Sequence, residues 1–149
     1  MAPRTALAGA RVLSFVQPAL SGSVTAAIVY QPGDAGSEGE AQAIQQALGG
    51  AAIGSLTLKL KRVAADSLGG LAGAKVAFIT RAVNARLVAP VAAQHGIITI
   101  SSDSSCALAG LCVVSISSGA KIQITVSKAA CVASKVKFGA AFLMLVKEI

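Results

Sequence analysis

Two kinds of segment alternate along this chain: continuous apolar runs, and stretches in which apolar positions recur at helical spacing. The apolar runs at residues 24–30, 75–80 and 97–101 are typical of strands covered on both faces. Residues 56–62 alternate strictly between apolar and polar, which predicts a half-exposed strand whose lysines discourage further pairing. We therefore expect a mainly parallel sheet with residues 56–62 at one edge.

Helical segments separate these strands. Residues 6–16 have helical spacing, and residues 67–71 predict a short helical turn. Ser37 and Glu40 have the spacing of a capping box, which predicts a helix that opens at Ser37 and ends at the following Gly-Gly pair. Another helix is predicted over residues 84–95, because a glycine follows directly.

The last third of the chain predicts a hairpin and a terminal helix. Two alternating strands, residues 114–117 and 121–127, flank a Ser-Gly turn. Residues 138–149 are apolar on nearly every side of a helix, so we expect this helix to be covered on more than one side. Its predicted interface residues are Phe142, Met144 and Val146.

The order of these elements predicts one α/β domain over residues 1–149. Strands that alternate with helices form doubly wound sheets, so we expect helices on both faces of a mostly parallel sheet in the order 2-1-3-4-5. An antiparallel C-terminal hairpin strand follows at the far edge. Folding of a chain this long removes roughly 68–70% of its unfolded surface from water, which is enough for a hydrophobic core that needs no disulfide or metal to hold it.

Composition narrows the classes of function. Hydrophobic residues make up 54% of the chain and charged residues 13%, so some apolar surface stays uncovered and a homodimer is expected. The net charge is +7, but the basic residues are scattered and aromatic residues are only 3%. Nucleic-acid binding is not expected, because such proteins concentrate lysine and arginine on one element or stack bases on aromatic rings.

The chain lacks the residue patterns of common enzymes and cofactor sites. It has no nucleophile elbow, no phosphate-binding loop and no dinucleotide fingerprint, so we expect neither enzymatic activity nor a cofactor. A metal site is not expected, because His95 is the only histidine, and we assign it to a helix C-terminus. A phospho-receiver domain needs an aspartate where Thr80 and Arg81 stand. A flavin carrier is disfavoured, because Tyr30 is the only tyrosine and the chain has no tryptophan to flank the ring.

Polar residues follow three of the predicted strands, at the edge where open α/β sheets form a crevice. They are Asp34 and Ser37 after the first strand, Thr80, Arg81 and Asn84 after the third, and Ser101, Ser102, Asp103 and Ser104 after the fourth. One interpretation is that they only cap helices and form turns. The other is that Arg81 and the helix amides after Ser37 hold a small polar or anionic ligand.

The three cysteines allow two interpretations. Cys106 and Cys112 enclose five residues, a loop that a disulfide can close with a stabilisation on the order of 2 kcal/mol. The alternative is two buried or reduced thiols. Cys131 lies in an apolar run, residues 129–133, and is predicted to be a core residue.

The chain resembles the YfiR-like family of small bacterial periplasmic proteins over nearly its whole length. The resemblance rests on the order and spacing of four motifs. They are Ala27-Ile-Val-Tyr-Gln-Pro-Gly-Asp34 with Ser37, Gly96-Ile-Ile-Thr-Ile-Ser101 with Asp103, Lys121-Ile-Gln-Ile-Thr-Val126, and residues 138–149. Residues 128–136 depart from the family pattern, which has a polar short helix ended by glycine there. Of the properties that the resemblance implies, the identity of the partner is therefore the one that carries over least from the family to this chain.

The resemblance implies a dimeric regulator that acts by protein contact. The family's namesake restrains a membrane-bound diguanylate cyclase and so limits cyclic-di-GMP signalling, and a similar partner is implied here, with gating by a ligand or by redox state. The resemblance also implies an oxidising periplasm and hence a Cys106–Cys112 disulfide. Two alternatives stay open: a periplasmic small-molecule binding module similar to one lobe of a solute receptor, and a structural protein that self-assembles through its terminal helix.

The N-terminal third bears on the compartment. Residues 12–33 carry no charge, but Pro18 and several polar residues interrupt the run, so we do not expect a transmembrane helix. Residues 1–20 match a signal peptide only in part. A mature periplasmic chain whose leader is replaced by Met1 fits equally well, and we expect that location.

Overall fold

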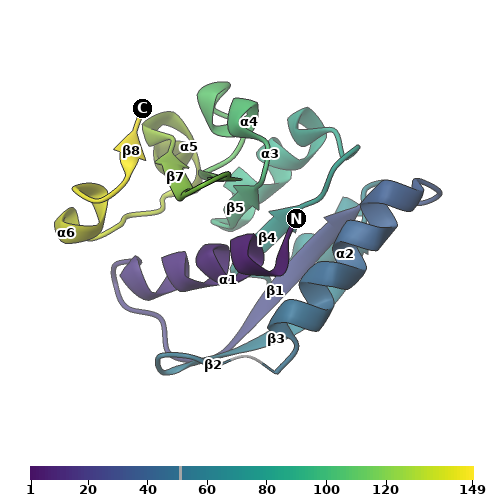
Figure 1. The fold of residues 1–149 in the computed structure, drawn as a ribbon, viewed down its shortest axis with the longest axis horizontal. Coiled ribbons are helices and arrows are strands. Elements are labelled where there is room, and N and C mark those ends of the chain that lie inside the picture. The colour runs from purple at the N-terminus through teal and green to yellow at the C-terminus, as the bar shows by residue number, and fades with distance from the viewer. Residues whose placement is uncertain (51) are drawn as a thin grey trace.

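The computed structural model describes residues 1–50 and 52–149, and within them one eight-stranded sheet has the order β2-β3-β1-β4-β5-β6-β7-β8 (Figure 1). The strands are β1 (Gly22–Tyr30), β2 (Ala52–Ile53), β3 (Leu56–Ala64), β4 (Val76–Ile79), β5 (Ile98–Ser101), β6 (Val114–Ser118), β7 (Ile122–Val126) and β8 (Lys147–Glu148). The helices are α1 (Pro3–Val12), α2 (Ala35–Leu48), α3 (Ala85–His95), α4 (Ser104–Leu108), α5 (Lys128–Ser134) and α6 (Ala140–Leu143), with 3₁₀ turns η1 (Leu13–Phe15) and η2 (Leu68–Leu71).

The predicted strand order is confirmed. Strands β3, β1, β4, β5 and β6 are parallel neighbours and correspond to predicted strands 2, 1, 3, 4 and 5. The predicted hairpin is the antiparallel pair of β6 and β7, in which Val114 lies opposite Val126. Two short strands extend the sheet beyond the prediction, because β2 pairs with the first two residues of β3 and β8 pairs with β7.

Helices cover both faces of the sheet, as predicted. Alternate residues of β1 point to opposite sides, because side chains alternate along a strand. Ala26 and Ile28 belong to the core that α1 and α2 cover, whereas Ala27 and Val29 belong to the core beneath α3 and η2. Figure 1 shows α1 and α2 together on the face nearer the viewer. The fold is therefore a doubly wound α/β sheet.

The start of α2 differs from the prediction. Its N-cap is Asp34, whose carboxylate accepts the backbone N–H of Ser37 at 2.8 Å, and the Glu38 carboxylate accepts the N–H of Gly33, also at 2.8 Å. Ser37 is therefore inside the first turn and is buried. The predicted capping box of Ser37 and Glu40 is wrong, because Asp34 is an equally good cap three residues earlier.

The predicted terminal helix is also wrong. Only Ala140–Leu143 is helical, and the chain then continues into β8, which adds to the open edge of β7. This pairing gives backbone groups of the last residues partners: the Ile149 N–H donates to Val126, and the Lys128 N–H donates to the Ile149 carbonyl. Self-assembly through an apolar terminal helix loses its structural basis.

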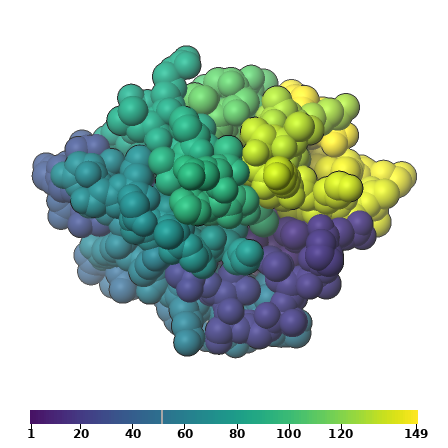
Figure 2. Space-filling view, turned by 180° about the vertical axis from the view of Figure 1, so that it is seen from behind, coloured from purple at the N-terminus to yellow at the C-terminus, as the bar shows by residue number. Residues whose placement is uncertain are grey.

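The predicted interface residues have different environments. Phe142 is only 4% exposed and stacks on Phe15, with ring centroids 4.6 Å apart, so it belongs to the chain's own core rather than to its exposed surface. Met144 is 86% exposed, and Val146 is partly buried. Figure 2 shows the C-terminal segment in yellow beside the N-terminal one in purple, where a bridge joins Val16 and Phe138.

The described helices are short. Helix α2 has 14 residues, and within residues 1–50 and 52–149 no helix combines the length and the apolar character that a membrane span needs. The uncharged run at residues 12–33 folds instead as the end of α1, η1 and β1.

Candidate functional site

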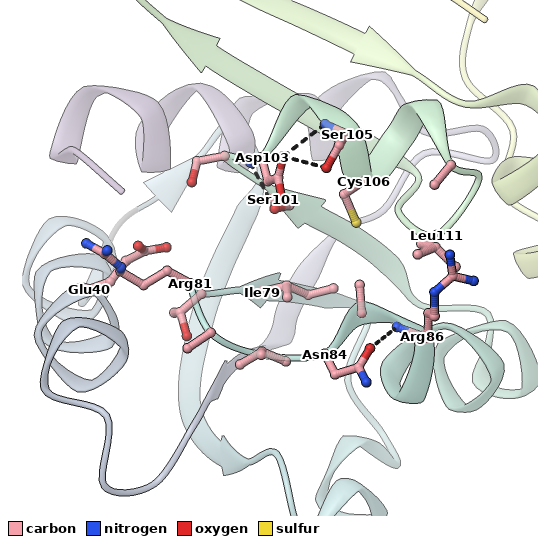
Figure 3. Close-up of a pocket in the computed structure, with 16 residues that line it drawn as sticks. Glu40, Ile79, Arg81, Asn84, Arg86, Ser101, Asp103, Ser105, Cys106 and Leu111 are labelled. Carbon is pink, nitrogen blue, oxygen red and sulfur yellow. Dashed lines mark hydrogen bonds between the residues drawn. The ribbon is translucent and has the colours of Figure 1, made fainter.

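An open crevice of ≈ 800 Å³ lies beyond the carboxyl ends of β4 and β5 (Figure 3). Its walls are the loop from β4 into α3, the loop from β5 through α4, and one side chain of α2. The lining residues are 40, 79–86, 101–103, 105, 106, 109 and 111. In a parallel sheet, these strand ends and the helix starts that follow them converge on one edge, which is where open α/β proteins bind ligands.

The loop after β4 supplies the cationic wall. Arg81 and Arg86 are both exposed and line the crevice, and Figure 3 places them at its two ends. Ala82, between them, has a φ of 69°. This left-handed conformation is unfavourable for alanine, so the loop is held in a strained turn. Asn84 caps α3, because its side-chain oxygen accepts the N–H of Arg86 at 3.0 Å.

Arg81 also lies close to the first turn of α2. A Cβ added to Gly36 would come within 3.1 Å of the Arg81 Cδ and Nε atoms, closer than ordinary side-chain contacts. Glycine at this position therefore leaves room for the arginine to extend across the helix start. The arginine crosses from one wall of the crevice to the other.

The loop after β5 supplies the hydroxyl and carboxylate groups. The Asp103 carboxylate accepts the N–H of Ser105 at 2.9 Å and the Ser105 hydroxyl at 2.7 Å, so Asp103 is the N-cap of α4. The Ser101 hydroxyl accepts the N–H of Asp103 at 3.0 Å. Ser115 of β6 donates to the Asp103 carbonyl at 2.8 Å and accepts the N–H of Ala107 at 3.0 Å. These bonds fix the loop against the sheet.

Most of the predicted ligand residues come together in this crevice. Those that line it are Thr80, Arg81, Asn84, Ser101, Ser102 and Asp103. Asp34 and Ser37 do not belong to its lining and serve the start of α2 instead. The buried Ser37 hydroxyl lies 2.7 Å from the Thr80 hydroxyl, and it also accepts the N–H of Gln31 at 2.8 Å. Ser104 is not among the lining residues either.

Three polar or charged lining residues escaped the sequence analysis of the crevice: Glu40, Arg86 and Ser105. Arg86 and Ser105 lie in the first turns of the helices that follow β4 and β5. The sequence could have predicted them, because the first turn of such a helix lies close to the end of the preceding strand. Glu40 comes from the second turn of α2. Nothing in its local sequence shows that it faces a crevice, because its place depends on how α2 crosses the sheet.

Glu40 has an unusual environment within the crevice. Its side chain is 7% exposed, and its Oε2 atom lies 3.0 Å from the amino nitrogen of Met1. Its Oε1 atom is buried and has no hydrogen-bond partner among residues 1–50 and 52–149. Buried polar atoms without a partner are uncommon, because desolvating them costs free energy that no bond returns.

The Cys106–Cys112 disulfide is present, as the resemblance implied, with the two Cα atoms 5.2 Å apart. It closes the loop that carries α4, and Cys106 lines the crevice. Cys131 is a free cysteine and is only partly buried, so its prediction as a core residue holds in part. Burial raises its pKa to about 11, with a further contribution from the Glu148 carboxylate.

The crevice presents groups of both signs. Arg81 and Arg86 supply guanidinium groups, Glu40 and Asp103 supply carboxylates, and Ser102 supplies a hydroxyl. Within the described part of the chain, no cluster of three or more His, Cys, Asp or Glu side chains is placed to hold a metal ion. The arrangement is suited to binding a small charged molecule by hydrogen bonds and ion pairs.

Comparison with known proteins shows a likeness to solved structures. No family model and no curated protein matches the chain. The fold is similar to the ligand-free, open structure of a substrate-binding protein with adhesive properties from Clostridium difficile, with a TM-score of 0.65 and 11% sequence identity. The likeness covers 85% of this chain and 54% of that one, so the chain spans about half the length of its neighbour. At this identity, the likeness shows the fold alone.

Proposed function

We propose that this protein is a non-enzymatic binding protein that holds a small ligand with an anionic group in the crevice beyond β4 and β5. The observation that carries the proposal is the convergence of Arg81, Asn84, Ser102 and Asp103 on one crevice from two separate loops. The arginine pairs with the anionic group, and the amide and hydroxyl supply neutral hydrogen bonds.

The place of the crevice in the topology supports this function. The chain leaves β1 through α2 toward β3 and later crosses to β4 on the other side of β1, where α3 covers the opposite face. Ligands of open α/β sheets bind near such a reversal, which lies here between β1 and β4. The crevice adjoins this point, because its lining includes residues 79–86 at the end of β4 and Glu40 of α2, the helix that follows β1. The crevice volume of ≈ 800 Å³ lies within the usual range for small-molecule sites.

Two further observations fit a role in the periplasm. The structural neighbour is a substrate-binding protein, a function that agrees with binding in the crevice. The Cys106–Cys112 disulfide is consistent with an oxidising compartment, and we assign the chain to the periplasm. There it captures a ligand and presents it to a membrane partner.

Isothermal titration calorimetry tests the proposal with inorganic phosphate, succinate and L-leucine as probes. We expect at least one probe to bind, and Arg81→Ala to weaken that binding about tenfold or more, because a charge-assisted bond is lost. Lys59→Ala is the matched control: Lys59 is an exposed cation on β3 and does not line the crevice. Binding that is equally strong in Arg81→Ala, or no binding of any probe, would contradict the proposal.

A second candidate is regulation by protein contact, as in the YfiR-like family. The observation that favours it is the exposure of Met144 and Leu145, at 86% and 81%, on the segment between α6 and β8. Large apolar side chains exposed in sequence are typical of contact surfaces. In this function the protein is a homodimer that restrains a membrane-bound diguanylate cyclase.

Co-expression with a membrane-bound diguanylate cyclase tests the second candidate. We expect a lower cellular level of cyclic-di-GMP, and we expect Met144→Ser/Leu145→Ser to restore it. Leu87→Ser is the matched control, because Leu87 is an exposed leucine on α3. An unchanged cyclic-di-GMP level, or a monomer by light scattering, would count against this candidate.

A further inference from the structure

Residues 128–149 form a surface at one side of the molecule that the crevice does not use. They comprise α5, the loop after it, α6 and β8, and Figure 2 shows them gathered there in yellow-green and yellow. None of them lines the crevice beyond β4 and β5. Their exposed side chains are called the C-terminal surface below. What binds there is independent of the ligand in the crevice.

Large apolar side chains are exposed on the C-terminal surface. Val132 of α5 is 80% exposed, and Met144 and Leu145, between α6 and β8, are exposed at least as fully. Val132 and Leu143 together line a hollow of ≈ 370 Å³, so α5 and the end of α6 lie side by side. Met144 and Leu145 follow Leu143 directly in the chain. Apolar side chains gathered in this way mark a contact surface.

The same surface is positively charged. Four lysines and one glutamate give this segment three of the chain's seven net positive charges. The glutamate, Glu148, is paired with Lys128, whose Nζ atom lies 3.7 Å from its Oε1 atom. Three lysines are exposed and have no ion-pair partner in the part of the chain that the structure describes: Lys135, Lys137 and Lys147. The partner of this surface is therefore anionic.

The residue types of the surface favour a lipid partner over a protein partner. Protein interfaces are enriched in arginine and aromatic residues and are depleted of lysine. Here lysine is the only basic residue type, and both phenylalanines of the segment, Phe138 and Phe142, are buried. Lysines beside exposed aliphatic side chains are typical of proteins that lie on anionic bilayers. The ammonium groups reach the lipid phosphates, and the apolar side chains enter the boundary between headgroups and acyl chains.

We infer that the C-terminal surface docks the protein onto a membrane that contains anionic phospholipids. Lys135, Lys137 and Lys147 pair with lipid phosphate groups, while Met144 and Leu145 enter the boundary with the acyl chains. Each contribution alone gives only weak membrane binding, because the lysines are few and the apolar area is small. The docking is therefore reversible and needs both contributions.

Vesicle sedimentation tests this inference on the full chain. One set of vesicles contains equal parts of phosphatidylcholine and phosphatidylglycerol, and the other contains phosphatidylcholine alone. We expect the protein to bind the phosphatidylglycerol vesicles at least about tenfold more tightly, and added sodium chloride to weaken this binding by screening the lysines. No binding to the phosphatidylglycerol vesicles, or equal binding to both sets, would overturn the inference.

A double lysine variant locates the charged contact. We expect Lys135→Gln/Lys137→Gln to weaken binding to phosphatidylglycerol vesicles about 25-fold, since each lysine near an anionic surface contributes about fivefold. Lys59→Gln/Lys61→Gln is the matched control, because it removes two lysines with the same spacing from β3, near the opposite edge of the sheet. An equal loss in the two variants would show attraction to net charge alone and would overturn the inference.

A double apolar variant tests the other contribution. We expect Met144→Ser/Leu145→Ser to weaken the same binding about tenfold, because two exposed apolar side chains no longer leave water. Leu87→Ser/Leu108→Ser is the matched control, since it replaces exposed leucines of α3 and α4. The thermal midpoint of each variant is measured beside its binding. Unchanged binding of Met144→Ser/Leu145→Ser would contradict the inference.

A second copy of the chain is the alternative occupant of this surface. If the phosphatidylglycerol vesicles bind no protein and light scattering shows a dimer that Met144→Ser/Leu145→Ser dissociates, the surface is a protein interface and the inference is wrong. Ligand binding in the crevice, measured by calorimetry without vesicles, does not depend on either result. The proposed function therefore stands or falls separately.

Discussion

Single residues of the crevice edge have separable roles in stability and in binding. Ser37 is buried, and its hydroxyl joins the Gln31 N–H to the Thr80 hydroxyl, which in turn donates to the Val29 carbonyl at 2.8 Å. Ser102 is exposed and lines the crevice. Serine therefore serves structure at one position and is available to a ligand at the other.

We predict that Ser37→Ala lowers the free energy of unfolding by about 1–3 kcal/mol, because the partly buried Gln31 N–H loses its acceptor and the buried Thr80 hydroxyl loses a partner. Urea unfolding followed by circular dichroism measures this change. Ser102→Ala, the comparison variant, should stay within about 0.5 kcal/mol of the parent but bind ligand more weakly. Equal stability of the two variants would contradict the assignment of Ser37.

Cys131 gives a prediction with a defined pH dependence. Its pKa is raised to about 11, first by burial and then by the Glu148 carboxylate, so the reactive thiolate is scarce at neutral pH. We expect iodoacetamide to label folded protein at pH 8 about a hundredfold more slowly than urea-unfolded protein. The reason is that a pKa of about 11 instead of 9.0 leaves about one hundredth as much thiolate at this pH. The rate should rise with pH until about 11.

Glu148→Gln tests how much the Glu148 carboxylate contributes to the raised pKa of Cys131. Removing its charge should lower the pKa of Cys131 toward the ordinary 9.0 and accelerate labelling, while burial keeps the rate below that of the unfolded chain. Equal labelling rates of folded and unfolded protein at pH 8 would show that Cys131 is not shielded. The disulfide leaves Cys131 as the free thiol to be labelled.

At the scale of elements, the packing of α1 on the sheet depends on a small residue. A Cβ at Gly9 would meet Phe78 at 3.1 Å, Ile100 at 3.2 Å and Ile116 at 3.4 Å. These side chains come from β4, β5 and β6, so Gly9 sets how closely α1 approaches three strands. A larger residue there must displace the helix or the core.

We predict that Gly9→Val destabilises the protein by about 1–3 kcal/mol through overpacking. Gly39→Ala in α2 is the matched control, since nothing lies within 4 Å of an added Cβ there. This second change should stabilise the protein by about 0.5–1 kcal/mol, because alanine loses less backbone freedom in a helix than glycine. Thermal unfolding of both variants measures the difference, and a stabilised Gly9→Val would contradict the close packing of α1.

The elements that the sequence predicts well are those with a clear burial pattern. Strands β1, β3, β4 and β5 have apolar runs or strict alternation, and α3 has both its cap and its terminal glycine in sequence. The two wrong predictions concern segments with competing signals. Asp34 and Ser37 are both good caps, and the first one in the chain is used. Residues 138–149 suit a helix, but the open edge of β7 offers pairing that no local pattern shows.

At the scale of the whole molecule, the crevice could be predicted in part. The topology brings strand ends together, so residues directly after β4 and β5 were expected at one place, and Thr80, Arg81, Asn84, Ser102 and Asp103 lie there. Glu40 was not foreseen as a crevice residue, because its position depends on the path of α2 over the sheet. The contribution of α2 to the crevice is therefore visible only in three dimensions.

The binding function of the crevice is the central claim, and nuclear magnetic resonance tests it most directly. Titration of ¹⁵N-labelled protein with inorganic phosphate, succinate and L-leucine in turn should, for at least one of them, shift backbone amides of residues 80–86 and 101–106 and leave α5 and the β6–β7 hairpin unchanged. Amide shifts that map to residues 128–149 instead, or a spectrum unchanged at saturating concentrations of all three compounds, would contradict the account.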